Sequence, residues 1–296
     1  MRHSHRSTVP TGKSAAAAHD LSHLLGASRV AQIRAALAAG EVEMTGPHVG
    51  RMTTDTLTAD VLLEPDDLIR VRCAVELDEP PQALLERGAG AAGNVRFAAF
   101  PSGRQLAAET RVNGAAHLPN SLRAIRCGFT HLLAGTASPD EPQADSKPMS
   151  EALSAAIQQT GWSKEDAVET AQGYELHSTL EGVRTAVEAA VGPDSVLVRK
   201  IVLAGPPDGA GGCAVAHQAL AMNARIRGCR LAIRAGRLQV ETRLHSPLLD
   251  GDWLTFVVRA VAGAARCVEP ELRLLADEPA VAEAYVQMFC ASANPL

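Results

Sequence analysis

The sequence predicts an α+β fold made of two tandem repeats, each a small antiparallel sheet packed with helices. The triplet Glu-Thr-Arg followed by an aliphatic residue occurs twice, at 109–112 and 241–244. Before each triplet, apolar and polar residues alternate on both sides of a glycine-containing turn, which is typical of a β-hairpin. Further upstream, each copy has an aliphatic stretch that begins at Pro-Asp and stops at Pro-Pro, at 64–81 and 192–208. Because these features recur in the same order, we interpret the sequence as an internal duplication.

The composition of the chain suggests four segments. We predict a flexible N-terminal tail at 1–24, a first α+β unit at 25–135, a linker at 136–148, and a second unit with a C-terminal helix at 149–296. The linker contains three prolines and no apolar periodicity, as expected for a solvated connector. A chain of 296 residues is long enough for two such domains.

Each unit is expected to run helix, two or three strands, helix, hairpin, helix. In the first unit we predict these elements at 28–39, 56–64, 68–75, 84–94, 95–112 and 121–132. The helix at 84–94 is weak, because it contains three glycines and each costs about 1 kcal/mol. In the second unit we predict them at 150–159, 182–191, 196–203, 214–226, 230–244 and 252–261. Segment 182–191 is rich in Ala, but its counterpart in the first unit is rich in Thr and Val, which favours a strand.

A further helix is predicted at the C-terminus, where Pro279 occupies a first-turn position that proline favours. Val281, Ala284, Tyr285 and Met288 recur at helical spacing and share one apolar face. We expect this C-terminal helix to dock on the second unit.

The second hairpin carries the candidate binding residues. Its alternation places Leu231, Ile233, Leu238, Val240 and Leu244 on a buried face and Arg230, Arg234, Gln239 and Arg243 on a polar face. One interpretation is an ordinary solvated sheet face. The other is a docking site for an acidic segment of a partner, because guanidinium groups pair well with carboxylates. On the second interpretation the partner-binding residues are Arg230, Arg234 and Arg243.

Both units also resemble a known family, the second over most of 150–265 and the first, less well, over 45–134. An Ala-, Leu- and Asn-rich helix with Leu220, Asn223 and Ile226 leads into the hairpin at 230–244, and a capped helix follows at 254–261. This pattern resembles the bacterial YbjN family and the similar class I type III secretion chaperone fold. The resemblance implies an α+β fold that binds other polypeptides, with no catalytic residues to carry over.

The resemblance also bears on assembly. Such units are usually single and pair as homodimers, whereas this chain joins two of them. We therefore expect a monomer with an internal pseudo-dimer, or else a homodimer. The strands at 68–75 and 196–203 are apolar on more than one face, so we expect the units to meet through them and to leave the hairpins outward.

Charge and hydropathy exclude several classes of partner. The net charge of −5 and the 3% aromatic content argue against nucleic-acid binding. No apolar run approaches the roughly 20 residues that span a bilayer, so no membrane partner is expected. The basic N-terminus lacks an apolar export segment, which predicts a cytoplasmic protein. The six cysteines include no Cys-x-x-Cys pair and are expected to stay reduced.

No motif in the sequence predicts catalysis. Thr11–Ser14 ends like a phosphate-binding loop but lacks the first glycine, and the glycine-rich segment 205–212 has no following Lys-Ser or Lys-Thr. His19 and His23 lie four residues apart without a third metal ligand. We expect no catalytic residue, cofactor or metal, and a non-enzymatic protein-binding protein, chaperone-like or adaptor-like. The alternative is an enzyme with an unrecognised site between the two units.

Overall fold

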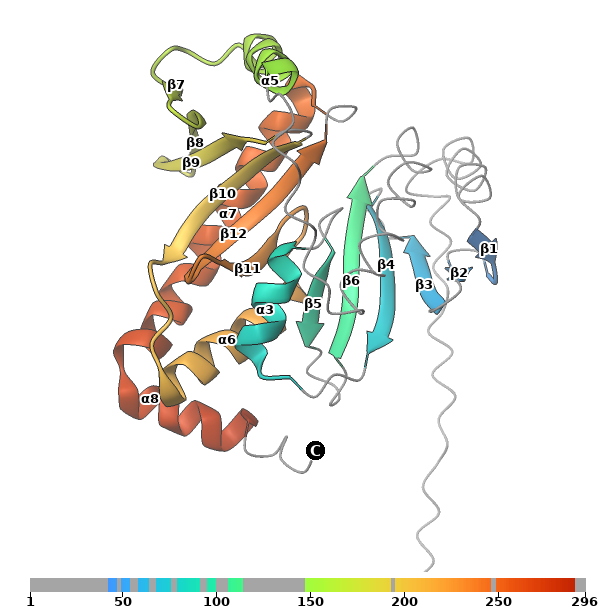
Figure 1. Ribbon diagram of the computed structural model, residues 1–296, viewed down its shortest axis with the longest axis vertical. Helices are drawn as coiled ribbons and strands as arrows, with labels where there is room; N and C mark the ends of the chain where they lie inside the picture. The colour runs from blue at the N-terminus through green and yellow to red at the C-terminus, as the bar shows by residue number, and fades with distance from the viewer. Residues whose placement is uncertain are drawn as a thin grey trace, which may run out of the picture.

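The computed structural model describes residues 42–46, 49–53, 58–63, 68–75, 79–90, 95–99, 106–113, 147–192, 195–245 and 249–290, which form an α+β protein (Figure 1). The described residues contain two antiparallel sheets of six strands each, five α-helices and a π-helical turn. The predicted tail at 1–24, nearly all of the linker, and the predicted helices at 28–39 and 121–132 lie outside them. None of the helices in these ranges is long and apolar enough to cross a membrane.

The first sheet consists of β1 (Val42–Met44), β2 (Val49–Thr53), β3 (Thr58–Leu63), β4 (Leu68–Val75), β5 (Arg96–Ala99) and β6 (Leu106–Asn113). The predicted first hairpin is confirmed, because β5 and β6 pair antiparallel with Arg96 opposite Glu109. The weak helix forms as α3 (Pro81–Gly90), and its first residue is a proline, whose missing amide hydrogen costs no helical hydrogen bond there. The short strands β1 and β2 were not predicted.

The second sheet consists of β7 (Ala167–Thr170), β8 (Gly173–Leu180), β9 (Val183–Val191), β10 (Ser195–Leu203), β11 (Arg230–Arg234) and β12 (Arg237–His245). Around it lie α5 (Lys147–Thr160), α6 (Gly209–Asn223), α7 (Gly251–Asp277), α8 (Pro279–Tyr285) and the π-helix η2 (Val286–Cys290). Segment 182–191 is a strand, as its counterpart in the first unit indicated. Helix α7 begins where predicted, and the Asp250 carboxylate accepts a hydrogen bond from the Trp253 amide at 2.7 Å.

The two sheets have the same strand order. The first runs β1-β2-β3-β4-β6-β5 and the second runs β7-β8-β9-β10-β12-β11. In each, four strands consecutive in the sequence are followed by a hairpin whose second strand pairs with the fourth strand. A helix precedes each hairpin, α3 in the first case and α6 in the second.

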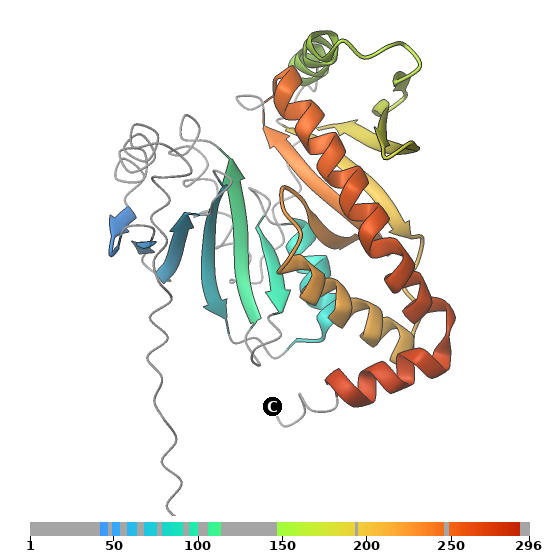
Figure 2. The same cartoon turned by 180° about the vertical axis from the view of Figure 1, so that it is seen from behind.

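Helix α7 covers one face of the second sheet, and the core lies between them (Figure 2). It packs against β8, β9, β10 and β12. The side chains predicted to be buried in the second hairpin are all buried: Leu231, Ile233, Leu238, Val240 and Leu244. Opposite them, α7 contributes Leu254, Val257, Val258 and Val261. The predicted inner face of the hairpin is therefore confirmed.

The two halves of the chain meet at the edges of the two sheets that β5 and β11 form. Helix α3 packs against β11, α6 packs against β5, and the two helices touch (Figure 1). The expected meeting through strands 68–75 and 196–203 is wrong, because α3, β5, α6 and β11 make the main contacts between the two halves among the described residues. The hairpins form the junction and do not point away from it.

Candidate functional site: a buried arginine–glutamate network

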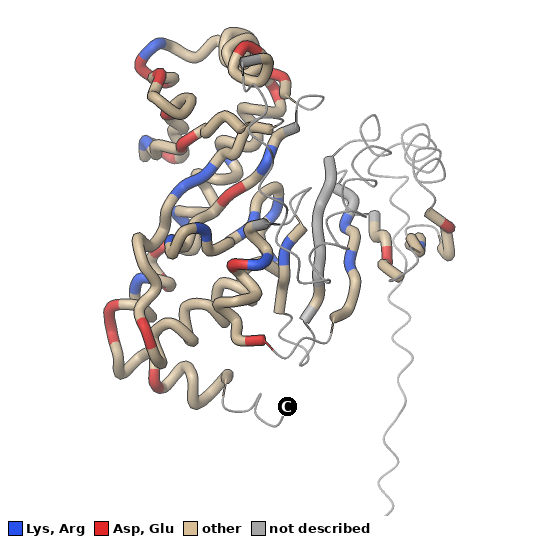
Figure 3. The backbone as a smooth tube through the Cα atoms, viewed as in Figure 1, with Lys and Arg blue, Asp and Glu red and all other residues tan. Residues whose placement is uncertain are grey.

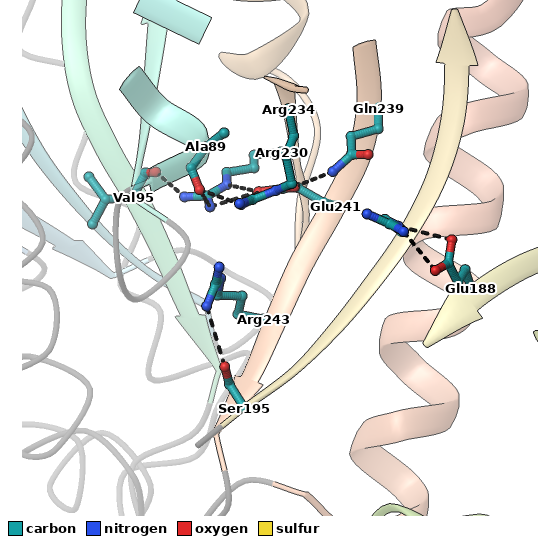
Figure 4. Close-up of polar contacts among 10 residues, drawn as sticks. Ala89, Val95, Glu188, Ser195, Arg230, Arg234, Gln239, Glu241 and Arg243 are labelled. Carbon is teal, nitrogen blue, oxygen red and sulfur yellow. Dashed lines mark hydrogen bonds and ion pairs between the residues drawn. The ribbon is translucent and has the colours of Figure 1, made fainter. Parts of the chain in front are cut away.

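Glu241 is the centre of a buried polar cluster at this junction. Its side chain is fully buried, and one carboxylate oxygen accepts hydrogen bonds from Nε and Nη2 of Arg230 at 3.0 and 2.8 Å. The other oxygen accepts from Arg234 Nε at 3.2 Å and from the Gln239 amide at 2.6 Å (Figure 4). The hairpin register explains this convergence. Arg230 lies directly opposite Glu241, and Gln239 lies two residues before it on the same face.

The same two arginines extend from the second hairpin to the end of α3. Arg230 donates from Nη2 to the Ala89 carbonyl at 3.1 Å and from Nη1 to the Val95 carbonyl, and Arg234 also donates to Ala89. Ala89 lies in the last turn of α3, where carbonyls have no helical partner. Cationic donors at a helix C-terminus satisfy such carbonyls and complement the helix dipole. The second unit therefore caps the glycine-rich helix of the first.

The contact is reciprocal. Arg96, at the start of β5, is only 2% exposed and donates to the carbonyl of Ile226 at 2.8 Å and to that of Cys229. Cys229 directly precedes Arg230, just as Val95 directly precedes Arg96. Each arginine therefore donates to the backbone carbonyl of the residue that immediately precedes the other arginine in the sequence. This is the pattern expected across a local two-fold axis.

Asn223 adds a third buried connection between the halves. Its amide nitrogen donates to the carbonyls of Phe97 and Leu231, each at 3.0 Å, and its amide oxygen accepts from the Leu231 amide at 2.7 Å. Asn223 is the last residue of α6. One side chain therefore fixes the helix, the second hairpin and the first sheet together.

The charges at the junction keep Glu241 ionised. Burial alone would raise the pKa of Glu241, but the charges and hydrogen bonds of Arg230 and Arg234 outweigh burial and lower that pKa to about 2. Burial lowers the pKa of Arg230, and Glu241 opposes this effect, so the guanidinium keeps its charge. A carboxylate this acidic, with both oxygens already accepting hydrogen bonds, is a poor general base at neutral pH.

The Arg230–Glu241 pair is one end of a ladder of charged residues that runs from β11 to β8. Figure 3 shows basic and acidic positions on neighbouring strands of this sheet. Directly opposite residues on successive strands are Arg230, Glu241, Arg199, Glu188 and Glu175. Arg199 donates to both carboxylate oxygens of Glu188, at 3.0 and 2.7 Å. Opposite charges at facing positions stabilise neighbouring strands, whereas the like charges of Glu188 and Glu175 at the end of the ladder do not.

The first four positions of this ladder recur in the first sheet with the same signs of charge, but the fifth residue there is Arg51 in place of Glu175. The facing residues of the first sheet are Arg96, Glu109, Arg72, Asp60, Arg51 and Glu43. The glutamates of the two Glu-Thr-Arg triplets occupy equivalent places in the two ladders, and so do Arg96 and Arg230. The glutamate of each repeated triplet is therefore the second residue of its ladder.

The predicted partner-binding arginines do share one face, but that face is not open. The expected solvent exposure of Arg230 and Gln239 is wrong, because both are buried where α3 and β5 cover the hairpin. Arg234 is half-buried and lies in the same network. Arg243 is also half-buried, and it donates to the Ser195 hydroxyl at 3.4 Å (Figure 4). The carboxylate that Arg230 and Arg234 bind belongs to Glu241 of the same chain.

Sequence reasoning missed Arg96, Ala89 and Val95 as parts of this site. The distance of Arg96 from its Glu-Thr-Arg triplet was the available signal, since Arg230 stands at a similar distance from the second triplet. Thr11–Ser14, His19 and His23 lie outside the described residues. The glycine-rich segment 205–212 leads into the first turn of α6.

Among the residues that the structure describes, no cluster of three or more His, Cys, Asp or Glu side chains is arranged to hold a metal ion. Cysteines 73, 213, 229, 267 and 290 are free thiols. No protein-family model matches the chain, and no curated protein is significantly similar to it.

Proposed function

We propose that this chain is a non-enzymatic, cytoplasmic protein-binding protein, chaperone-like or adaptor-like, built as a covalently joined pseudo-dimer. The proposal keeps the resemblance of the second unit to the bacterial YbjN family and to class I type III secretion chaperones. In this view the two tandem repeats pair with each other as two separate chains would.

The observation that carries the proposal is the equivalence of the two ladders. Arg96 lies opposite Glu109 as Arg230 lies opposite Glu241. Each arginine also donates a hydrogen bond to the backbone carbonyl of the residue that precedes the other arginine. The shared strand order supports the same inference. Duplication of an ancestral unit that paired through its hairpin edge accounts for the matching arginine positions, the reciprocal hydrogen bonds and the shared strand order.

The chemistry of the junction favours binding over the enzymatic alternative. A site between the two units would use titratable groups that converge there, yet Glu241 is held ionised and its oxygens are occupied by Arg230, Arg234 and Gln239. Arg230 itself is fully buried. These groups join the halves, so the function is expected on outer surfaces.

Two measurements test the proposal. Light scattering on the purified full chain should give a monomer near its mass of 31.0 kDa. Affinity capture from a native extract, with quantitative mass spectrometry, should retain one polypeptide in a defined stoichiometry that can be reconstituted from purified components. A stable homodimer would contradict the internal pseudo-dimer. Failure to reconstitute any stoichiometric complex would contradict the binding function.

A further inference from the structure

The C-terminal helix exposes an apolar surface that no described element covers. Met288 and Phe289 of η2 are 63% and 53% exposed, and Val281 of α8 is 39% exposed. We refer to these three residues as the C-terminal apolar face. Val281 and Met288 lie seven residues apart, close to two helical turns, so they project in similar directions. Large exposed apolar side chains that gather on one element mark interaction sites.

The C-terminal helix docks on the second unit, as predicted, through its contacts with α6 and α7. Of its predicted apolar face, however, only Tyr285 is partly buried, and Ala282 supplies the buried contact beside it. Val281, Ala284 and Met288 remain exposed. The helix is therefore apolar on two sides, and only one side has a partner within the described part of the chain.

A series of side-chain hydrogen bonds holds the C-terminal helix in place on its buried side. The Tyr285 hydroxyl lies 3.0 Å from Nδ1 of His217 and donates to the side-chain amide oxygen Oε1 of Gln218 at 2.7 Å. Gln218 in turn donates to the Glu271 carboxylate at 2.7 Å. The Phe289 ring packs on Tyr285 with ring centroids 4.8 Å apart. The exposed face is therefore held on a fixed element before any partner arrives, which lowers the entropic cost of binding.

The surroundings of this face are acidic. Residues 269–290 contain five acidic residues and one basic residue, Arg273, in a chain whose total net charge is −5. Arg273 is paired with Glu269. The exposed carboxylates of Asp277, Glu278 and Glu283 make no ion pair with any residue that the structure describes.

We propose that the C-terminal apolar face binds a basic amphipathic helix of a partner polypeptide. The apolar side of that helix would cover Val281, Met288 and Phe289, and its Lys or Arg side chains would face Asp277 and Glu278. A second copy of the chain would bring two acidic surfaces together, and an anionic membrane has the same sign, so both are disfavoured. This proposal rests on the proposed protein-binding function and names the chemistry of the partner.

The test uses the full chain and two fluorescent 18-residue peptides. One has a Leu/Lys amphipathic helical pattern, and in the other every Lys is replaced by Glu. Fluorescence anisotropy should show saturable binding of the Lys peptide that weakens as salt is added, and none of the Glu peptide. The variant M288Q/F289Q should bind the Lys peptide about tenfold more weakly or worse, as should D277N/E278Q.

Val183→Thr is the matched control, because Val183 is 47% exposed on β9, outside the C-terminal helix. It should leave peptide affinity unchanged, and all variants should keep the thermal midpoint of the natural chain. The proposal is overturned if the Lys peptide does not bind, if M288Q/F289Q binds it normally, or if the Glu peptide binds equally well. It is also overturned by a dimer, or by anionic vesicle binding, that M288Q/F289Q abolishes.

The experiment separates this proposal from the proposed function. If M288Q/F289Q still reconstitutes the captured complex at full affinity, the chain is a protein-binding protein that uses another surface. If no complex exists at all, the function itself is contradicted.

Discussion

Replacing Glu241 with Gln should destabilise the fold by about 3–5 kcal/mol, because it leaves Arg230 charged in a fully buried place without its counter-ion. The pKa of Glu241 gives a consistent magnitude. A fall from 4.5 to about 2 corresponds to about 3 kcal/mol of stabilisation of the ionised form. The variant also turns an amide NH2 group toward guanidinium donors, which cannot accept a hydrogen bond.

Urea unfolding at pH 7 measures the effect. Trp162 and Trp253, the two tryptophans of the chain, both lie in the second unit and report its unfolding by fluorescence. Glu188→Gln is the control, because Glu188 also pairs with an arginine, Arg199, but its side chain is 34% exposed. A half-exposed pair of this kind is worth up to about 1 kcal/mol.

The pH dependence gives a second readout with a fixed sign. A carboxylate whose pKa falls on folding stabilises the native state above its unfolded pKa, and that contribution is lost as the pH falls. For Glu241 the loss should occur between pH 4.5 and about 2. Glu241→Gln should flatten the stability profile in that window. If Glu241→Gln cost no more than Glu188→Gln, and the profile kept its slope, the network would not hold the junction together.

Three further predictions concern other buried contacts. Val240→Ala should cost about 1–3 kcal/mol in urea unfolding because the side chain is fully buried, whereas Val183→Ala, at an exposed position, should cost less than about 0.5 kcal/mol; equal effects would mean that the wrong hairpin face was assigned to the core. Asn223→Ala should unpair the Leu231 backbone groups at about 1–3 kcal/mol each, and hydrogen exchange of the Leu231 amide should accelerate while that of Val240 does not. Asp250→Ala should remove the cap of α7 and cost about 1 kcal/mol, seen as a lower thermal midpoint; no change would show that the cap is dispensable.

The elements that the sequence predicted well are those with local signals. Period-two alternation placed Leu231, Ile233 and Val240 on the buried side of the hairpin, and the Asp250 cap located the start of α7. Alternation groups side chains onto one face, but it does not reveal what covers that face. The contacts of Arg230 with Ala89 and Val95 cross more than 130 residues of sequence, so no local pattern contains them.

The C-terminal helix shows a related limit. Helical spacing grouped Val281, Ala284, Tyr285 and Met288 on one face, but of these only Tyr285 packs on the second unit, beside Ala282, whose small side chain allows close approach to α6. Hydropathy ranks Val and Met above Ala, and it therefore favoured the face that stays exposed. Strands β1, β2, β7 and β8 were not predicted, and β1, β2 and β7 are only three to five residues long, too short for a periodic signal.

The meeting of β5 and β11 has a consequence for solubility. A sheet edge with unpaired backbone groups is a template for aggregation. Here α6 covers the β5 edge and α3 covers the β11 edge, so each half shields the other. The opposite edges are β1 and β7, which are only three and four residues long and present the exposed carboxylates Glu43 and Glu169. Because both halves are on one chain, the shielding of the β5 and β11 edges is intramolecular. It therefore does not depend on the concentration of the protein.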